Sequence, residues 1–349
     1  MRLKLISSAL AMLACVAYLP AQVPDDTIKV DTRLVSVPVI VSDHDGRYVP
    51  HLQQSDFKVF QDGVEQQIAF FAATEEPITV AILIDTSHST HGVLDDIKDS
   101  AKSFIKLLTP QDRAMVVSFD NDTHILSPLT NDQKQLSEAI KHAEIPEDPG
   151  TTLRDAVYQT VTNSFKGING RKAVIVLTDG KDAGSYIRST DLLYRLEESD
   201  TLVYTIMFET EREAPNRRMG RGGVFGGGFP GMGGRFPGGG GRFPGGRGGG
   251  GRRDGERQKR MEERQKQQNE NAAEFLKNLS DTTAGRFFSS KDGKLKKTFA
   301  DILEELRFQY RLGFYPPDED RSGLHQLRVR VTKENAVVRS RVAYRSGAK

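Results

Sequence analysis

The spacing of hydrophobic residues divides the chain into two kinds of region. In residues 28–75, and again in 309–346, apolar residues alternate with other residues, and Val35, Val37 and Val39 give the clearest example. A period of two is typical of a β-strand with one buried face. Because short β segments from opposite ends of a chain can pair, these two regions predict one small β-sandwich.

The region between them, residues 76–308, alternates between two patterns. Mostly apolar stretches that predict strands occur at 78–84, 114–119, 173–177 and 202–208, with a shorter one at 286–288. The stretch at 173–177 is apolar throughout, which is typical of a central parallel strand. Helical spacing of apolar residues occurs at 93–108, 133–143, 153–165, 272–279 and 295–308, and a further helix begins at 192. This alternation predicts an α/β fold with a doubly wound, mainly parallel, Rossmann-like sheet that is inserted into the sandwich.

Residues 1–22 have the layout of a secretory signal peptide. Arg2 and Lys4 precede an apolar run at 5–17. That run is shorter than the roughly 20 residues that a membrane-spanning helix needs. Cleavage is expected near residues 21–22, which would deliver an exported protein to the periplasm, the cell surface or the medium. No other stretch approaches the length of a membrane span.

Cysteine content narrows the class of protein. The sequence has one Cys, Cys15, and no Trp, which excludes a disulfide scaffold and any Cys-based zinc site. Lipidation of Cys15 would make the chain a lipoprotein. Met12 and the apolar residues after Cys15 argue against this alternative, and an uncleaved anchor is another. The mature chain would contain no Cys and could not depend on disulfides.

The charge balance excludes two further classes. Lys and Arg number 49 and Asp and Glu number 47, so signal cleavage, which removes two basic residues, leaves 47 of each sign. A chain with no net charge is neither a uniformly basic nucleic-acid binder nor an acidic solvating chain. Because a signal peptide would also export the chain, we expect no nucleic-acid partner.

Glycine is concentrated in one segment, residues 215–255. Within it, residues 220–251 hold 19 of the 33 glycines, and residues 217–253 contain eight Arg and no acidic residue. Such a composition cannot bury enough surface to offset its ordering entropy, which predicts a disordered insertion in the α/β region. A solvated linker is the simplest interpretation. The alternative is contact with an anionic surface, since Arg supplies charge and Phe supplies stacking.

Oxygen-bearing side chains follow two expected strands and lie on one loop between them. Asp85, Ser87 and Ser89 come directly after the strand at 78–84, and the sequence Thr-Asp-Gly at 178–180 follows the strand at 173–177. The loop between them carries Thr151 and Thr152. The carboxyl ends of parallel strands meet at one edge of a sheet, so these side chains should converge there. Carboxylate and hydroxyl oxygens suit Mg²⁺, Mn²⁺ or Ca²⁺ rather than zinc or copper.

The order of these loops resembles the metal-ion-dependent adhesion site of von Willebrand factor A-type (VWA) domains. There, Asp-x-Ser-x-Ser is followed by a Thr and then by Thr-Asp-Gly. The wider frame is similar to the VWFA-related family described from acidobacteria, and the matching stretches are 37–43, 56–63, 85–87 and 310–315. The resemblance covers roughly residues 28–345 apart from the glycine-rich segment, and it implies a VWA fold for residues 76–308.

The resemblance also implies a role for each residue. The metal ligands would be Asp85, Ser87, Ser89, Thr151 and Asp179, with Thr152 as the alternative to Thr151. His88 stands where the family usually has Gly and would lie at the rim of the site, while Asp155 and Asp182 would support its loops. The cofactor would be a divalent cation, with Mg²⁺ expected first and Mn²⁺ or Ca²⁺ as alternatives.

Such a site predicts a binding protein rather than an enzyme. Two carboxylates would neutralise the cation and the hydroxyls would add no charge, which leaves a position for an acidic side chain of a protein partner. The sequence contains no evident general base, no Gly-x-Ser-x-Gly and no His-Glu-x-x-His. The alternative function is a metal-independent envelope scaffold whose glycine- and arginine-rich segment binds anionic surfaces.

Overall fold

The computed structural model describes residues 34–73, 76–148, 150–208, 250–290, 294–317 and 323–346, with only the backbone described at 250–255. The chain divides into two units, Met1–Arg33 and Leu34–Lys349, and all described residues belong to the second. The expected signal peptide, residues 1–22, lies outside the described residues. So does most of the glycine-rich segment, residues 209–249.

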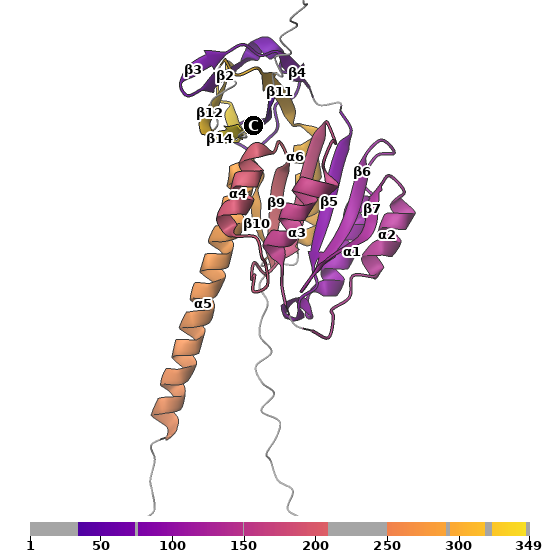
Figure 1. Ribbon diagram of the computed structural model, residues 1–349, viewed down its shortest axis with the longest axis vertical. Helices are drawn as coiled ribbons and strands as arrows, with labels where there is room; N and C mark the ends of the chain where they lie inside the picture. The colour runs from indigo at the N-terminus through magenta and orange to yellow at the C-terminus, as the bar shows by residue number, and fades with distance from the viewer. Residues whose placement is uncertain are drawn as a thin grey trace, which may run out of the picture. The chain divides into compact units, whose positions relative to one another are not determined.

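A six-stranded sheet forms the centre of the described unit (Figure 1). Its strands are β5 (Ile78–Asp85), β6 (Arg113–Phe119), β7 (Thr123–Thr130), β8 (Arg171–Thr178), β9 (Leu202–Phe208) and β10 (Phe287–Ser290), in the spatial order β10-β9-β8-β5-β6-β7. All neighbouring pairs are parallel except β6 and β7. From β5 the chain adds β6 and β7 on one side and then β8, β9 and β10 on the other. This change of direction at β5 is the doubly wound arrangement that the sequence predicts.

Helices cover both faces of this sheet. One face packs against α1 (Leu94–Ile105), α2 (Gln133–Lys141) and α6 (Leu295–Arg307), and the other against α3 (Leu153–Gln159), α4 (Ser189–Glu198) and α5 (Gly250–Thr283). Side chains of β5 alternate between the layers: Ile82 and Ile84 join the first core, while Ala81 and Leu83 join the second. Burial on both faces explains why β5 is apolar throughout.

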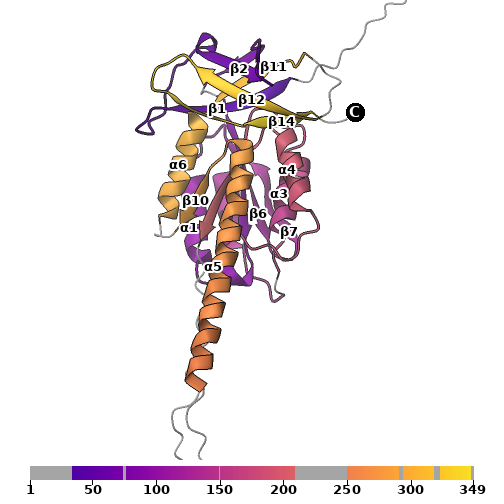
Figure 2. The same ribbon diagram turned by 90° about the vertical axis from the view of Figure 1, so that its left-hand side faces the viewer.

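Strands from both ends of the described unit form two further four-stranded sheets. One sheet has the order β13 (Val337–Ser340), β1 (Val35–Ser42), β11 (Tyr310–Phe314) and β4 (Phe70–Ala72). The other has the order β14 (Ala343–Ser346), β12 (Gly323–Val331), β2 (Phe57–Gln61) and β3 (Val64–Gln66). Their inner faces share one core that includes Val37, Val59 and Val329. The α/β fold with a sandwich built from both ends is thereby confirmed (Figure 2).

Buried charges join this sandwich to the α/β region. Glu305 of α6 is 1% exposed, accepts a hydrogen bond of 2.6 Å from the Tyr204 hydroxyl, and forms an ion pair with Arg339 of β13. Arg341, which follows β13, donates to the backbone carbonyls of Ser199 (2.9 Å) and Ser36. The two regions are therefore held together by hydrogen bonds and an ion pair as well as by apolar packing.

Helix α5 differs from the sequence prediction. The sequence predicts a helix at 272–279, but α5 spans Gly250–Thr283 and includes residues 250–255, the last part of the segment predicted to be disordered. The sequence after position 255 is rich in Glu, Gln, Lys and Arg, which have high helix propensity. Ion pairs between Lys259 and Glu263 and between Lys266 and Glu270 add support at a spacing of four residues. Local propensity therefore extends the helix beyond its packed end.

Among the residues that the structure describes, no helix is both long enough and apolar enough to cross a membrane.

Candidate metal centre

Asp85 ends the central strand β5 at the point where the strand order reverses. Its side chain is fully buried. Oδ1 accepts a hydrogen bond of 2.9 Å from the Ser87 amide, and Oδ2 accepts one of 2.6 Å from the Thr178 hydroxyl. Because Thr178 ends the neighbouring strand β8, this bond links two strand ends across the switch point, where ligands bind in doubly wound sheets.

The loop after β5 turns sharply and brings two hydroxyls together. A short 3₁₀ helix, η2 (His88–Thr90), begins directly after Ser87, and the Thr90 hydroxyl donates to the Ser87 carbonyl at 2.7 Å. The Ser87 and Ser89 hydroxyl oxygens lie 3.1 Å apart. Ser87 is 4% exposed, whereas the His88 side chain points to solvent. The turn thus brings the two serine hydroxyls together next to Asp85 and leaves the His88 side chain exposed.

Asp179 follows β8 and lies close enough to Asp85 for their charges to interact. It is 2% exposed, accepts a hydrogen bond of 3.1 Å from the Lys181 amide, and forms an ion pair with the Lys181 ammonium group. Gly180 has φ of +78°, and a Cβ there would come within 2.9 Å of the Ala272 Cβ. Only glycine therefore lets the chain turn between Asp179 and α5.

The third loop carries Thr151 and Thr152 to the same edge. Both residues are buried. The Thr152 hydroxyl donates to the carbonyl of Asp120, which follows β6, at 2.9 Å. The Thr151 carbonyl accepts hydrogen bonds from the amides of Ala183 (3.1 Å) and Gly184 (3.0 Å). These bonds fasten the loop to the segments that follow two other strands. The Thr152 hydroxyl donates its hydrogen but keeps its oxygen lone pairs, so Thr151 and Thr152 both stay candidate ligands.

Asp155 and Asp182 hold loops in place. The carboxylate of Asp155 accepts hydrogen bonds from the amides of Tyr186 (3.0 Å) and Ile187 (2.8 Å). Asp182 accepts bonds from the Arg154 amide (2.9 Å) and the Ser185 hydroxyl (2.7 Å), and it pairs with the Arg154 guanidinium group at 3.2 Å. Both carboxylates are engaged in tying the start of α3 to the loop after β8, so a supporting role suits them.

The raised pKa of the Asp85 carboxyl favours a cation beside it. Burial raises its pKa to about 6, and the hydrogen bonds from Ser87 and Thr178 offset only part of that effect. The nearby charge of Asp179 raises the pKa further. A buried carboxylate that is held by hydroxyl and amide donors, without a cation at hydrogen-bond distance, gains most from a positive ion placed next to it.

The donor set fits a hard divalent cation that is bound largely by hydroxyls. Within the described ranges, no three His, Cys, Asp or Glu side chains gather as a metal-binding cluster. A cation at this edge would therefore need the hydroxyls of Ser87, Ser89 and Thr151 besides the two carboxylates. Oxygen ligands of this kind suit Mg²⁺, Mn²⁺ and Ca²⁺.

Sequence reasoning names Thr178 only as part of Thr-Asp-Gly and does not name Lys181 or Asp120 at this edge. Thr178 bonds directly to Asp85, and Lys181 pairs with Asp179. The carboxylate of Asp120 accepts a hydrogen bond of 3.2 Å from the Thr86 hydroxyl. Asp120 could have been found, because it directly follows a predicted parallel strand. Nothing in the spacing predicts which oxygens Thr178 and Lys181 contact.

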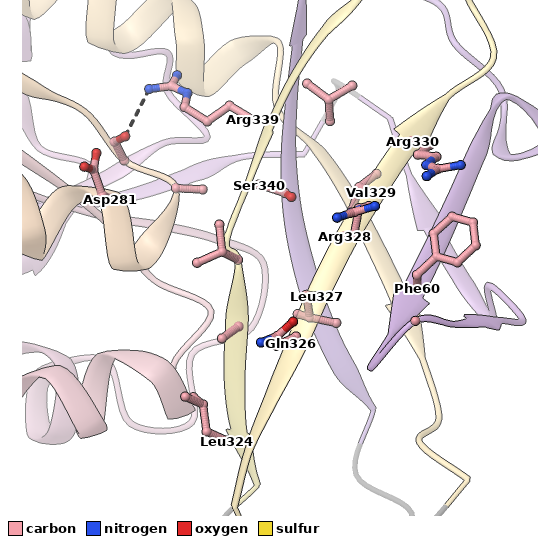
Figure 3. Close-up of a pocket in the computed structure, with 16 residues that line it drawn as sticks. Phe60, Asp281, Leu324, Gln326, Leu327, Arg328, Val329, Arg330, Arg339 and Ser340 are labelled. Carbon is pink, nitrogen blue, oxygen red and sulfur yellow. Dashed lines mark hydrogen bonds between the residues drawn. The ribbon is translucent and has the colours of Figure 1, made fainter.

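The sandwich carries a separate hollow of about 1040 Å³ (Figure 3). Arg328 and Arg330 of β12 lie on its wall, and the guanidinium group of Arg330 stacks 5.3 Å from the centre of the Phe60 ring. Arg339 donates to the Gly285 carbonyl at 3.0 Å and also pairs with Glu305. Two of its three arginines are thus engaged within the fold, and the hollow lies apart from the residues around Asp85.

Comparison with known proteins supports the fold assignment. The family model described as "von Willebrand factor type A domain" matches residues 79–221. No curated protein matches the chain.

Several solved structures are similar at low identity. A conserved hypothetical protein, BatB, from Bacteroides thetaiotaomicron is 16% identical over 65% of this chain and 98% of that chain, with a TM-score of 0.42. A von Willebrand factor type A protein from Catenulispora acidiphila is 12% identical over 84% of this chain and 75% of that chain, with a TM-score of 0.46.

Proximal thread matrix protein 1 from the mussel byssus, solved with a zinc-occupied MIDAS motif, is 15% identical over 69% of this chain and 48% of that chain, with a TM-score of 0.45. The family match, rather than these likenesses, carries the assignment. It spans all of the loops described above, from Asp85 to Asp182. The chain therefore carries a von Willebrand factor type A domain.

Proposed function

We propose that this domain binds a protein partner through a divalent cation held by Asp85, Ser87, Ser89, Thr151 and Asp179, and that the chain is exported. Domains of this type commonly mediate protein–protein interaction. The observation that carries the proposal is Asp85. It is a fully buried carboxylate at the switch point of the sheet, its pKa is raised, and it accepts hydrogen bonds from the Ser87 amide and the Thr178 hydroxyl.

The chemistry of binding follows from the charges. Two carboxylates would balance a divalent cation, and the hydroxyls would add donors without adding charge. When bound, the cation would supply a Lewis-acidic position that an acidic side chain of a partner can occupy. The role of the described residues is to hold the oxygens in place: Thr178 fixes Asp85, and the loop bonds of Asp155 and Asp182 fix the third loop.

Metal-independent binding is the second candidate. The specific observation in its favour is Lys181, whose ammonium group already pairs with Asp179. An internal cation beside one expected ligand lowers the gain from a bound metal. In that case the partner would contact the domain, or the glycine- and arginine-rich segment would contact an anionic surface, without any metal.

Calorimetric titration of the metal-stripped mature protein with Mg²⁺, Mn²⁺, Ca²⁺ and Zn²⁺ tests the proposal. We expect saturable binding of a hard divalent cation and a loss of at least 100-fold in affinity in Asp85→Ala. Asp122→Ala is the matched control, because Asp122 is an exposed carboxylate in the neighbouring loop. Equal affinity in all three proteins would exclude this metal site. Binding of none of the cations would favour the metal-independent candidate.

A further inference from the structure

Helix α5 runs past the carboxyl edge of the sheet, where the candidate metal centre lies (Figures 1 and 2). Its packed part contacts the loop after β8: Gln268, Asn271 and Phe275 line a hollow together with Gly180 and Asp182. The same face of the helix therefore borders the loop that carries Asp179.

This face continues as a basic stripe. Continuing at helical spacings of three and four residues from Gln268 leads to Arg264, then to Arg260 and Met261, and then to Arg257. All four side chains are exposed, Met261 by 57%. Within the part of the chain that the structure describes, none of the three arginines forms an ion pair or a side-chain hydrogen bond. We call Arg257, Arg260 and Arg264 the basic stripe.

Charged side chains on other faces of the same helix segment have partners within the helix. Lys259 pairs with Glu263, and Lys266 pairs with Glu270. The amide of Gln258 donates to Glu262 at 3.0 Å. Glu256 lines a hollow with the stripe residues, so the stripe together with Glu256 carries a net charge of +2. Among the described residues, the paired charges thus lie on other faces of the helix. The positive charge of the basic stripe lies on the face that borders the loop carrying Asp179.

We propose that the basic stripe is a second docking surface for an acidic segment of the same protein partner whose carboxylate reaches the metal centre. The inference rests on the proposed function. The stripe extends over two turns, about 10 Å, from the helix face that lines the Asp182 loop. Arginine forks bind carboxylates with two parallel hydrogen bonds, so the stripe would select an acidic segment and orient it toward the site.

Two other occupants fit this surface less well. A second copy of the chain would have to present an acidic stripe, and the other faces of α5 are internally paired rather than acidic. A membrane surface is bound by helices with a broad apolar face. Met261 is the one apolar side chain between positions 256 and 271 of this helix. An acidic protein segment remains the occupant that matches both the charge and the polarity of the stripe.

The test uses the mature full-length chain and a fluorescein-labelled decapeptide of L-glutamate, with Mg²⁺ present at low ionic strength. The stripe variant combines Arg257→Gln, Arg260→Gln and Arg264→Gln. The control variant combines Lys259→Gln, Lys266→Gln and Lys277→Gln, which removes the same charge from the same helix. From the usual size of exposed ion pairs, we expect the stripe variant to bind about tenfold more weakly and the control to change less than about twofold.

A local readout separates contact with the stripe from long-range attraction. Cys15 is the only cysteine in the sequence and would be removed with the signal peptide. Met261→Cys therefore provides a unique attachment point for an environment-sensitive fluorophore in the stripe, and Lys266→Cys provides the matched point outside it. The peptide should change the emission of the label at 261 and leave that at 266 unchanged.

The outcomes distinguish this inference from the proposed function. Equal weakening in the stripe and control variants, or in neither, overturns the stripe as a docking surface. If chelator leaves peptide affinity unchanged while the stripe variant still weakens it, the metal-dependent function fails and the stripe holds. Stripe-dependent binding to phosphatidylserine vesicles with no binding of the peptide would overturn the inference in favour of a membrane. Stripe-dependent dimers in light scattering would overturn it in favour of a second copy.

Discussion

Carboxylates are buried at both ends of the parallel strands of the central sheet, but their hydrogen-bond partners differ between the two ends. At the edge toward the sandwich, Asp112 accepts hydrogen bonds from both terminal nitrogens of Arg307, at 3.2 and 2.5 Å, and Glu305 pairs with Arg339. At the carboxyl edge, Asp85 is equally buried but receives its hydrogen bonds from Ser87 and Thr178. At the sandwich end, each of these carboxylates pairs with an arginine. At the carboxyl edge, Asp85 accepts hydrogen bonds from neutral groups.

The pKa values reflect this contrast. Burial alone would raise the pKa of Asp112, but hydrogen bonds from Arg307 and from backbone amides bring it below its usual range. Burial raises the pKa of Asp85 to about 6, because its hydrogen bonds do not compensate fully. A carboxylate with a built-in arginine contributes to the fold. A buried carboxylate kept without one costs stability, and such a cost is typical of functional sites.

The largest effect that would test this contrast is expected at Glu305. Glu305→Gln removes a buried negative charge that pairs with Arg339, accepts a hydrogen bond from the Tyr204 hydroxyl and lies 3.9 Å from the Arg286 guanidinium group. We expect a loss of about 3 kcal/mol in the free energy of unfolding, as for other broken buried pairs. Urea denaturation in chelator measures it.

Glu304→Gln is the control for this prediction, since Glu304 is the exposed neighbour on α6. Similar stability of the two variants would mean that the buried pair at the sandwich edge is not a structural element.

A smaller loss is expected at Asp112. Asp112→Asn should cost about 2 kcal/mol at neutral pH, because Arg307 is partly exposed and water can replace some of the lost contact. The lowered pKa gives the pH dependence: the ionised carboxylate stabilises the fold above the unfolded pKa of about 3.9, and this contribution is lost as pH falls through the folded pKa.

The variant and the parent protein should therefore converge in stability below about pH 4. Urea denaturation at several pH values measures this, with Asp99→Asn as an exposed control. A difference that stays constant from pH 7 to pH 3 would contradict an ionic role for Asp112.

Most of the fold follows from hydrophobic periodicity. β5 and β8 are predicted because burial on both faces makes them apolar throughout. β7 (Thr123–Thr130) is missed because it is an edge strand with few buried residues, and its sequence contains Pro128. The length of α5 is also missed, because most of the helix before position 272 has no apolar face and depends on propensity and charge pairing instead.

For the candidate site, the sequence predicts which loops meet at the edge of the sheet, but not which side chains contact each other there. Parallel strands bring Asp85 and Asp179 to one edge, and this convergence is visible in the sequence. Which side chains then bond to each other depends on rotamers and loop geometry. The Thr178 hydroxyl contacts Asp85, and Lys181 pairs with Asp179, yet neither contact has a sequence spacing that would indicate it. The roles of the five expected ligands stay a prediction for the metal titration.

The smallest expected effect is at Asp85, where a substitution should stabilise the fold rather than destabilise it. This prediction tests most directly the contrast between Asp85 and the arginine-paired carboxylates. Because the folded pKa of Asp85, about 6, lies above the unfolded value, the folded protein holds this proton more tightly. Stability of the metal-free protein should therefore fall as pH rises from about 4 to about 6. Asp85→Asn removes the buried charge and should stabilise the metal-free fold by about 1 to 2 kcal/mol at pH 7.5.

Thermal or urea denaturation in chelator, at pH 4 and pH 7.5, measures this gain, most of which should be absent at the lower pH. Added metal should then stabilise the parent protein and leave Asp85→Asn unchanged. A destabilised Asp85→Asn at pH 7.5, comparable with Asp112→Asn, would mean that both edges use their acids structurally. In that case the neutral donors around Asp85 would suffice for its charge, and the main reason for placing a cation there would be gone.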